Sequence, residues 1–471
     1  MSKLNCIIFL FSFLFVSCIT DDFFPGGGNN DACSEDQVLA FPTAQGFGKY
    51  ASGARSVAHP EVYKVTNLND SGQGSFRDAV SKSGRFVLFE VSGIINLQSP
   101  VSIANNLTIA GQTAPGDGIV LYGQKVSFTG ANHTIARYLR IRLGNTSGIS
   151  KNTDASGIAN GKNIILDHFS VSWGLDEVFS INWDKKGFEP DSITIQNSII
   201  AQGLHRHNHS AGGLIQSENG HISILNSLYA SNKTRNPKVK GKSEYVNNIV
   251  YNYGNKDNPM GHTVSGAAYI MGGSAMVSEV NIINNYFISG PLTLDNEETP
   301  FSRGTETFNV YASGNYFDNN KNGILDGNLV PEDTLGYPGL LPANLKSSPY
   351  PYPEMNTFLS ASQAYNYVKN NAGANYPSQD EVDELIMAEL DSKGTQGIYV
   401  YTESDLSLSN NGLGNYESTN SPTDSDQDGI PDIWENQLGL NPNDATDALE
   451  VSSICENYLN IEMYINGLVD L

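Results

Sequence analysis

Beyond about residue 100 the chain repeats a short pattern of alternating apolar and polar positions. Such alternation predicts short strands with one buried face. The isoleucines of four successive blocks recur every 29 residues, at Ile135, Ile164, Ile193 and Ile222. A fixed period of this size, with turns and no intervening helices, favours a solenoid whose coils stack on one another. We therefore expect an all-β fold, a parallel β-helix, with a β-sandwich as the alternative.

Two asparagines fall at the same place in successive repeats. Asn197 and Asn226 each follow the last residue of a predicted strand. An amide side chain both donates and accepts hydrogen bonds, so stacked asparagines can form a ladder inside the turns. We expect such a ladder at these two positions.

The spacing of apolar residues changes after the solenoid. Residues 360–370 and 379–392 have helical spacing, and the Pro- and Gly-rich stretch 331–353 is typical of irregular loop. Residues 457–466 favour a further helix. The predicted organisation is a solenoid domain over 38–330, a loop and helix extension over 331–420 that packs on it, and a small separate acidic module over 421–471.

The first residues have the pattern of an export signal. Lys3 precedes an apolar run over 7–16, which predicts a signal peptide over 1–17. Residues 15–18 resemble the lipobox of bacterial lipoproteins, with Cys18 as the acylated residue. Lipidation would anchor the chain to a membrane through a flexible tether over 18–37. We expect a lipoprotein of the bacterial outer membrane or cell surface, with a secreted or periplasmic protein as the alternative.

Two cysteines remain near the ends of the mature chain, Cys33 and Cys455. An oxidising compartment would permit a disulfide between them. The sequence does not show whether they lie close together, so the disulfide stays an open question at this point.

The net charge of −23 is unevenly distributed. Residues 1–290 carry 21 acidic and 22 basic side chains, whereas residues 421–471 carry 11 acidic and no basic ones. The acidic total argues against nucleic acid as a partner. The nearly neutral first part would not repel an anionic substrate. After the N-terminal segment, the sequence has no apolar run long enough to span a membrane.

A basic segment follows one of the predicted solenoid strands. Residues 226–241 bring Arg235, Lys238 and Lys240 into one short stretch. Together with segments 154–157, 165–168 and 172–177, this stretch resembles the pectate lyases of polysaccharide lyase family one. The resemblance covers about residues 38–290, with a weaker continuation to about 395. Further matching segments are Ala40-Phe41-Pro42, Gly46-Phe47-Gly48, Val65-Thr66-Asn67-Leu68, Gly74-Ser75-Phe76-Arg77-Asp78-Ala79 and Ala110-Gly111-Gln112-Thr113-Ala114-Pro115-Gly116.

The resemblance implies a right-handed parallel β-helix and a definite chemistry. It implies calcium-dependent β-elimination of α-1,4-linked polygalacturonate, which yields unsaturated oligogalacturonides. Arg235 matches the family's catalytic arginine, which takes the C5 proton, and Lys240 matches a residue that binds a uronate carboxylate. Asp154 and Asp176 match aspartates that bind the catalytic calcium. Lys238, beside Lys240, is a further candidate for substrate binding.

The chemistry also follows from the residue types. Removal of a proton next to a carboxylate requires stabilisation of an enolate-like charge. A hard cation with oxygen ligands provides it, and Ca²⁺ tolerates loose coordination. A guanidinium normally stays protonated, so neighbouring cations would have to lower the pKa of Arg235. Otherwise Arg235 would act as an electrostatic clamp with water or hydroxide as the base. A solvated basic loop is the alternative reading.

The metal-binding pattern departs from the family at one position. Many members have a second aspartate four residues after the one that matches Asp176, but this chain has Ser180 there. Glu177 is a candidate to supply the missing carboxylate. The ion could also be bound only together with the substrate.

Other candidate groups flank this pattern. His207 and His209 stand about one coil before Arg235, where the family often has a substrate-binding lysine. The histidines of this segment could alternatively bind a transition metal. Arg140 and Arg142 alternate with apolar residues and are expected to point outward, as a solvated stripe or as a flank of the uronate groove, so Arg140 is a candidate for substrate binding.

The C-terminal module contains an EF-hand-like loop. Acidic residues occupy positions 1, 3, 5, 9 and 12, and Gly429 occupies position 6, which is the ligand spacing for Ca²⁺. We expect this ion to stabilise the module rather than to take part in catalysis. The predicted ligands are Asp424, Asp426, Asp428, Asp432 and Glu435.

Three functions are weighed. The first is a calcium-dependent pectate lyase, expected to be a monomer with polygalacturonan as its partner. The second is a polygalacturonase-type hydrolase, which needs clustered acid and base carboxylates that the predicted solenoid does not offer in the usual motifs. The third is a non-catalytic, pectin-binding surface lipoprotein, against which the set of Arg235, Asp154 and Asp176 argues.

Overall fold

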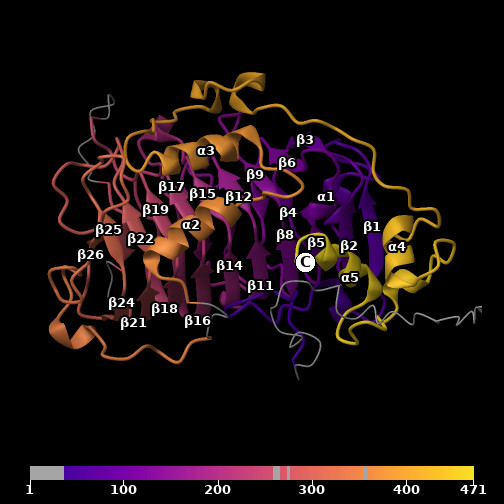
Figure 1. Ribbon diagram of the computed structural model, residues 1–471, viewed down its shortest axis with the longest axis horizontal. Helices are drawn as coiled ribbons and strands as arrows, with labels where there is room; N and C mark the ends of the chain where they lie inside the picture. The colour runs from indigo at the N-terminus through magenta and orange to yellow at the C-terminus, as the bar shows by residue number, and fades with distance from the viewer. Residues whose placement is uncertain (1–36, 258–265, 273–275, 354–357, 471) are drawn as a thin grey trace, which may run out of the picture.

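The computed structural model describes residues 37–257, 266–272, 276–353 and 358–470. Its strands form a sixteen-stranded and a ten-stranded sheet that run along the molecule as a stack of coils (Figure 1). Among the named strands, each pairing is parallel except that of β25 with β26. The predicted all-β parallel β-helix is therefore confirmed. The signal peptide, Cys18, Cys33 and nearly all of the tether lie outside the described residues.

Each coil has three walls because the larger sheet has two arms. Strands β16 (Leu214–Leu225) and β18 (Lys238–Val246) pair in both arms, and their register shifts between Gln216 and His221. The first halves of β16 and β18 therefore belong to wall 3 and their second halves to wall 1. The smaller sheet is wall 2.

The remaining strands fall into these walls as follows. Wall 1 contains β1 (Glu61–Val65), β2 (Arg85–Phe89), β5 (Thr108–Ala110), β8 (Thr134–Arg137), β11 (Lys162–Asp167), β14 (Asp191–Gln196), β21 (Ser278–Ile283) and β24 (Phe308–Ser313). Wall 2 contains β3 (Gly93–Asn96), β6 (Ile119–Tyr122), β9 (Arg140–Arg142), β12 (Ser170–Ser172), β15 (Ile199–Ala201), β17 (Leu228–Ala230), β19 (Ile249–Tyr251), β22 (Tyr286–Ile288), β25 (Tyr316–Asp318) and β26 (Asn328–Leu329). Wall 3 contains β4 (Val101–Ser102), β7 (Val126–Ser127), β10 (Ser156–Ile158), β13 (Phe179–Asn182), β20 (Tyr269–Met271) and β23 (Phe301–Ser302).

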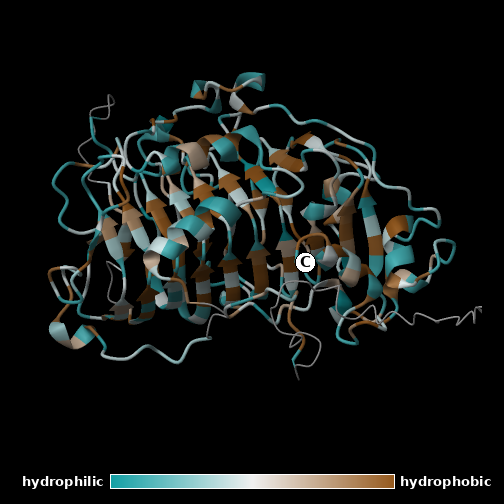
Figure 2. Cartoon of the chain, in the orientation of Figure 1, coloured by the Kyte–Doolittle hydropathy of each residue, from teal (hydrophilic) through white to brown (hydrophobic). Residues whose placement is uncertain are grey.

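The hydrophobic core fills the inside of the coils, and the hydrophobic colours of Figure 2 concentrate in the strands. Ile164, Ile193 and Ile222 stack in register as the period predicts. Ile135 does not belong to this row, because Ile164 pairs with Thr134 and Ile135 pairs with Ile165. Ile135 instead packs against the N-terminal segment 40–51. The one-residue offset turns its side chain to the outer face of the sheet.

The corner between walls 1 and 2 has a left-handed residue in most coils. Asn197 and Asn226 take this conformation, with φ of 51° and 50°, which asparagine tolerates well. The ladder predicted at these two positions is absent, because Asn197 donates to Asp167 and Asn226 Oδ1 has no partner among the described residues. An asparagine ladder is found instead in later coils, one position further along the corner. Its buried hydrogen bonds run from Ser227 N to Asn248 Oδ1 (2.9 Å), from Asn248 N to Asn285 Oδ1 (2.8 Å) and from Asn285 N to Asn315 Oδ1 (3.1 Å).

The helices lie outside the solenoid. Helix α2 (Ala361–Asn371) begins at Ser360 with a capping box to Gln363, and α3 (Glu381–Asp391) is capped by Asp380, close to the predicted helical segments. The other helices are η3 (Gly53–Ser56), α1 (Phe76–Ala79), η4 (Gly111–Thr113), η5 (His205–His207), η6 (Pro342–Asn344), η7 (Glu403–Asp405), η8 (Asn410–Gly412), α4 (Asp432–Leu438), η9 (Asp447–Leu449) and α5 (Asn460–Gly467). Within the described residues no helix combines the length and apolarity that a bilayer span needs.

The acidic C-terminal module packs on the first coils of the solenoid instead of standing apart. It shares a hydrophobic cluster with Phe86 and Leu88 of wall 1. Ion pairs tie the two parts together: Arg55 to Glu462 (2.5 Å), Lys64 to Asp424 (3.0 Å) and Arg137 to Asp470 (2.9 Å). Cys455 is buried in the module and is disulfide-bonded.

Candidate active site

A cavity of about 240 Å³ opens on the outer face of wall 3. Strand β13 explains its polar floor, because Phe179 and Ile181 point into the core while Ser180 and Asn182 point outward. Four neighbouring coils contribute its lining residues: Lys125, Thr129, Asp154, Gly157, Ile158, Ala159, Glu177, Ser180, Asn182, Asp184 and Leu214.

Three carboxylates gather where strands β10 and β13 begin. Asp154 precedes β10, and Asp176 and Glu177 precede β13 on the next coil. The peptide N–H of Glu177 donates to Asp154 Oδ1 (3.2 Å), which joins the two coils at this point. Asp176, Glu177 and His209 each offer one ligand atom within 4.8 Å of the others. The predicted set of Asp154, Asp176 and Glu177 is thus brought together.

Each of these carboxylates faces a basic side chain. Lys125 Nζ lies 3.1 Å from Asp154 Oδ2, and His209 Nε2 lies 2.7 Å from Asp176 Oδ1. Arg235 forms an ion pair with Glu177, whose side chain is only 6% exposed. The contact with His209 lowers the pKa of Asp176. Burial raises the pKa of Asp154, although Lys125 opposes this effect.

Arg235 lies on the coil that leads into β18. It has a left-handed backbone with φ of 58°, and its carbonyl accepts the N–H of Gly213 (2.7 Å). Burial lowers the pKa of Arg235, and Arg303 adds to this lowering, whereas Asp176 opposes it. A guanidinium held this way is closer to giving up its proton than a free one.

Lys238 and Lys240 continue the basic surface along wall 3. They alternate on β18, in register with Leu214 and Gln216 of the previous coil. Burial lowers the pKa of Lys238, and the neighbouring Lys240, Arg235 and Arg303 lower it further. A row of cations therefore leads away from the carboxylates.

Ser180 occupies the position where the resemblance leads one to expect a second aspartate. It is buried, lines the cavity, and its hydroxyl accepts the N–H of Leu214 (3.0 Å). Glu177, one residue after Asp176, is the acid that the structure adds to the cluster instead.

The histidine segment separates into three environments. His205 is buried beside Tyr399, His207 is exposed, and His209 reaches Asp176. Burial and the neighbouring Arg206 and Lys151 lower the pKa of His207. Among the described residues, only His209 of this segment belongs to a possible metal-binding group.

The placement of Arg140 in a substrate groove is corrected by the structure. Arg140 is fully buried on wall 2, beneath the segment that joins α2 to α3. Its guanidinium donates to the carbonyls of Asp117 (2.8 Å), Ala374 (2.6 Å) and Ser378. Arg140 does point outward from its strand, but the helical extension covers that face, which the alternation could not reveal.

Two basic residues of the site were missed in the sequence. Lys125 directly precedes β7, one coil before Asp154, and Arg303 is a single arginine in an acidic stretch. Neither residue lies in a recognisable sequence motif. Only the stacking of coils brings them near Asp154 and Arg235.

The C-terminal loop forms a second acidic cluster. Asp424, Asp426 and Asp428 offer ligand atoms within 4.8 Å of one another, and so do Asp428, Glu435 and Asp447. Asp447, from η9, was missed in the sequence. Asp432, a predicted ligand, instead accepts hydrogen bonds from the N–H (2.8 Å) and hydroxyl (2.7 Å) of Ser425.

Glu435 is the residue of this cluster that most needs a bound cation or a proton. It is fully buried, and neither carboxylate oxygen has a hydrogen-bond partner within the described part of the chain. Burial, with the charges of Asp426, Asp428 and Asp447, raises its pKa to about 7. Burial likewise raises the pKa of Asp428 to about 6. This donor set of hard oxygens fits a divalent cation such as Ca²⁺.

Comparison with known proteins gives the family. No family model matches the chain. It is 46% identical over 432 residues to the "Probable pectate lyase C" of Aspergillus flavus, covering 92% of this chain and 94% of that protein, and its match to the Aspergillus oryzae protein of that name has the same identity and coverage. The chain therefore belongs to the pectate lyase family, and it is an enzyme of the polysaccharide lyase class. These relatives are fungal, so they do not support the bacterial lipoprotein prediction, which concerns residues outside the described ranges.

Solved structures show more distant likenesses. The cedar pollen allergen jun a 1 has a TM-score of 0.49 at 17% identity, and the match covers 75% of this chain and 99% of the allergen. A point mutant of Bacillus subtilis pectate lyase has a TM-score of 0.49 at 15% identity, and the match covers 70% of this chain and 97% of the mutant.

Proposed function

We propose that this chain is a calcium-dependent pectate lyase that cleaves α-1,4-linked polygalacturonate by β-elimination and releases unsaturated oligogalacturonides. The observation that carries the proposal is the juxtaposition of Arg235 with Asp154, Asp176 and Glu177 on a cation-lined wall of the β-helix. The relatives named above are probable pectate lyases, which agrees with this reading.

In this proposal Asp154, Asp176 and Glu177 hold Ca²⁺ in the groove. The donor set fits, because three carboxylates from two adjacent coils converge at one edge of an open cavity. The ion would neutralise the uronate carboxylate and stabilise the negative charge that develops next to it. His209 would position Asp176, and Glu177 would give up its ion pair with Arg235 in order to bind the cation.

Arg235 is the proposed catalytic residue. Its lowered pKa and its place beside the carboxylates suit the removal of the C5 proton of a uronate bound on wall 3. The electron pair of the broken C5–H bond forms the new C4–C5 double bond, the C4–O bond breaks, and the departing glycosidic oxygen takes a proton from water. Lys238 and Lys240 would bind uronate carboxylates along the row, and the exposed His207 would contact the chain at its margin.

The C-terminal cluster is proposed to hold a second, structural Ca²⁺. Its ligands would be Asp424, Asp426, Asp428, Glu435 and Asp447. The buried and unpartnered Glu435 supports this assignment, because an isolated buried carboxylate is costly without a cation.

Export of the chain is also proposed. The disulfide at Cys455 supports an oxidising compartment, since such bonds are rare in the cytosol. A lipid anchor at Cys18, as the lipobox-like segment suggests, would hold the enzyme on a membrane, and we propose that it acts as a monomer. Radiolabelled fatty acid incorporated by the wild type and absent from a Cys18→Ser variant would establish the anchor; equal labelling of both would remove it.

One assay distinguishes elimination from hydrolysis. Polygalacturonate is incubated with the enzyme in the presence of Ca²⁺ or chelator, while ultraviolet absorbance and reducing ends are followed together. Elimination creates a conjugated unsaturated uronide, so absorbance rises with the reducing ends and stops with chelator. Reducing ends without absorbance would show a hydrolase, and the absence of both would show a binding protein or another substrate.

A further inference from the structure

A second and larger cavity, of about 470 Å³, lies away from wall 3. It sits at the corner between walls 1 and 2, and α2 and the C-terminal residues 468–470 contribute to its lining. Its volume is in the range of roughly 300–1,000 Å³ that is usual for small-ligand sites. Three tyrosines and three asparagines dominate its lining: Tyr138, Tyr367, Tyr376, Asn197, Asn371 and Asn375.

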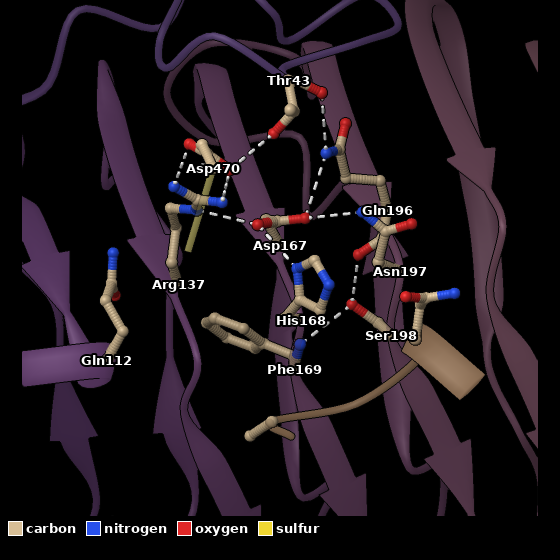
Figure 3. A network of polar contacts seen from close by, with 12 residues as sticks. Thr43, Gln112, Arg137, Asp167, His168, Phe169, Gln196, Asn197, Ser198 and Asp470 are labelled. Atoms are coloured by element: carbon tan, nitrogen blue, oxygen red, sulfur yellow. Dashed lines mark hydrogen bonds and ion pairs between the residues drawn. The ribbon is translucent and has the colours of Figure 1, made fainter. Parts of the chain in front are cut away.

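A network of ion pairs and hydrogen bonds lies behind part of the lining of this cavity and includes the lining residues Asn197, His168 and Asp470. Figure 3 shows Arg137 between Asp167 and Asp470, with Nε 2.8 Å from Asp167 and Nη1 2.9 Å from Asp470. Gln196 and Asn197 each donate to Asp167 Oδ1 at 3.0 Å. Two carboxylates thus pair with the guanidinium of Arg137 behind the lining, and no lysine or arginine lines the cavity within the described chain. An acidic sugar would find no charge partner here.

His168 fixes one side of the cavity. Its ring stacks on that of Tyr138, with centroids 4.5 Å apart and planes 7° apart. Its Nδ1 lies 2.8 Å from Asp167 Oδ2, and its Nε2 has no hydrogen-bond partner in the part of the chain that the structure describes. The position of the ring is therefore set before any ligand arrives.

The amides at the opposite rim are fixed in a similar way. Asn371 Nδ2 donates to the carbonyl of Tyr367 (2.8 Å), and Asn375 Nδ2 donates to that of Asn371 (3.1 Å). Each amide keeps its Oδ1 without a partner among the described residues. The hydroxyl of Tyr367 donates to Asn197 Oδ1 (3.3 Å), which fixes both of these side chains.

We propose that this cavity is a second carbohydrate-binding site, which takes an uncharged glycosyl unit. Sugar hydroxyls both donate and accept, and they match preformed amide and imidazole groups. Tyrosine rings offer apolar faces to the C–H groups of a pyranose, and their hydroxyls remain polar. The absence of a free cation from the described lining selects neutral sugars over uronates. Such a site would hold the enzyme on neutral chains while the groove on wall 3 acts on acidic ones, and the site does not depend on the lyase reaction.

The test uses the full chain and a variant that fills the cavity. Val469 lines the cavity, so Val469→Trp would block it, and Val451→Trp is the matched control because Val451 is 60% exposed in the same module. Neutral oligosaccharides of galactose, arabinose, xylose and glucose, three or four units long, are titrated by calorimetry alongside trigalacturonate. The unfolding midpoint and the lyase rate on soluble polygalacturonate are measured for each variant.

We expect at least one neutral oligosaccharide to bind, with affinity lowered at least tenfold in Val469→Trp and unchanged in Val451→Trp. Asn375→Ala, which removes a free acceptor with little change in packing, should lower affinity several-fold. The lyase rate should not change in any of these variants. Lack of binding by every neutral sugar, equal binding by Val469→Trp, or trigalacturonate binding that Val469→Trp abolishes would each overturn the proposal. The lyase rate of the wild type reports separately on the proposed function.

Discussion

The two acidic clusters of this enzyme differ in how their negative charge is compensated. In the groove on wall 3, Asp154, Asp176 and Glu177 each face Lys125, His209 or Arg235. In the C-terminal module, Glu435 is fully buried, and its carboxylate lies beside the charges of other acids. The first cluster is balanced by the protein itself. In the second, Lys64 pairs with Asp424, but the other acids have no basic partner among the described residues and need protons or a cation from outside.

The difference suggests a division of roles between the two sites. A cation that enters the groove must displace basic side chains, so it should bind weakly and exchange with substrate. A cation in the C-terminal cluster removes the cost of several uncompensated carboxylates, so it should bind tightly and support folding. Because this module packs on the first coils, its cation would stabilise the N-terminal end of the solenoid.

The largest expected effect comes from the arginine of the balanced cluster. Arg235→Lys keeps a positive charge near Glu177 but removes the guanidinium, so we expect the rate on polygalacturonate to fall by roughly a hundred- to ten-thousand-fold. Thermal unfolding should stay within about a degree or two of the wild type. The matched control is Arg206→Lys, since Arg206 is exposed. A loss of less than about tenfold would contradict the role of Arg235.

Chelator should lower the stability of the protein by removing the proposed Ca²⁺ from the C-terminal acidic cluster. Removal of Ca²⁺ should lower the unfolding midpoint of the wild type by several degrees, because a bound ion at 100 times its Kd contributes about 2.7 kcal/mol. Glu435→Gln removes both a ligand and a buried charge, so its midpoint should shift much less with chelator. Glu450→Gln, an exposed acid of the same module, serves as the control. Equal chelator shifts in all three proteins would refute the assignment.

A third buried acid, Glu389, extends the comparison, because burial rather than a neighbouring charge raises its pKa. Glu389 on α3 accepts a hydrogen bond from Ser231 (3.0 Å), and burial raises its pKa to about 7. Between the unfolded value of 4.5 and about 7, only the unfolded state loses the proton, so stability falls as pH rises.

Glu389→Gln should therefore gain stability over the wild type as pH rises through this window, by about 3 kcal/mol at most. Urea unfolding at pH values below and above the window measures the gain, and Glu384→Gln on the exposed side of α3 is the control. A difference between Glu389→Gln and the wild type that does not vary with pH would show that Glu389 is ionised in the folded enzyme.

The smallest effect is expected when the basic partner of Asp154 is removed from the groove on wall 3. Lys125→Met removes the cation that pairs with Asp154 and keeps the length of the side chain. The proposed groove ion would then lose a competitor, so the Ca²⁺ concentration for half-maximal rate should fall about three- to tenfold. Lys186→Met is an exposed control in the loop after β13. An unchanged or higher Ca²⁺ requirement would mean that Lys125 does not compete with the ion.

The repeat of apolar residues was enough to predict the β-helix, because burial inside each coil requires alternation in the sequence. The exact register was not predictable. Ile135 lies one residue outside the row of stacked isoleucines, and the asparagine ladder is formed by Asn248, Asn285 and Asn315 rather than by Asn197 and Asn226. The period marks where a strand lies, but the coil from β8 to β11 is one residue longer than the two coils after it, and this offset moves Ile135 to the other face of the sheet.

The candidate site was predictable where its residues lie in motifs. Asp154, Asp176, Glu177 and Arg235 come together as expected, and α2 and α3 lie close to the segments with helical spacing. Contacts between distant segments were not predictable. Arg140 is covered by a segment more than 200 residues later, and Asp447 joins the C-terminal cluster from a separate turn.

The most direct test of the two-cluster account is a count of bound Ca²⁺ by native mass spectrometry. The wild type should carry one ion at low free Ca²⁺ and a second only at higher concentrations. Glu435→Gln should lose the first ion, and Glu177→Gln should lose the second. A wild type that binds no ion at low Ca²⁺, or a Glu435→Gln variant that retains the tight ion, would contradict the account.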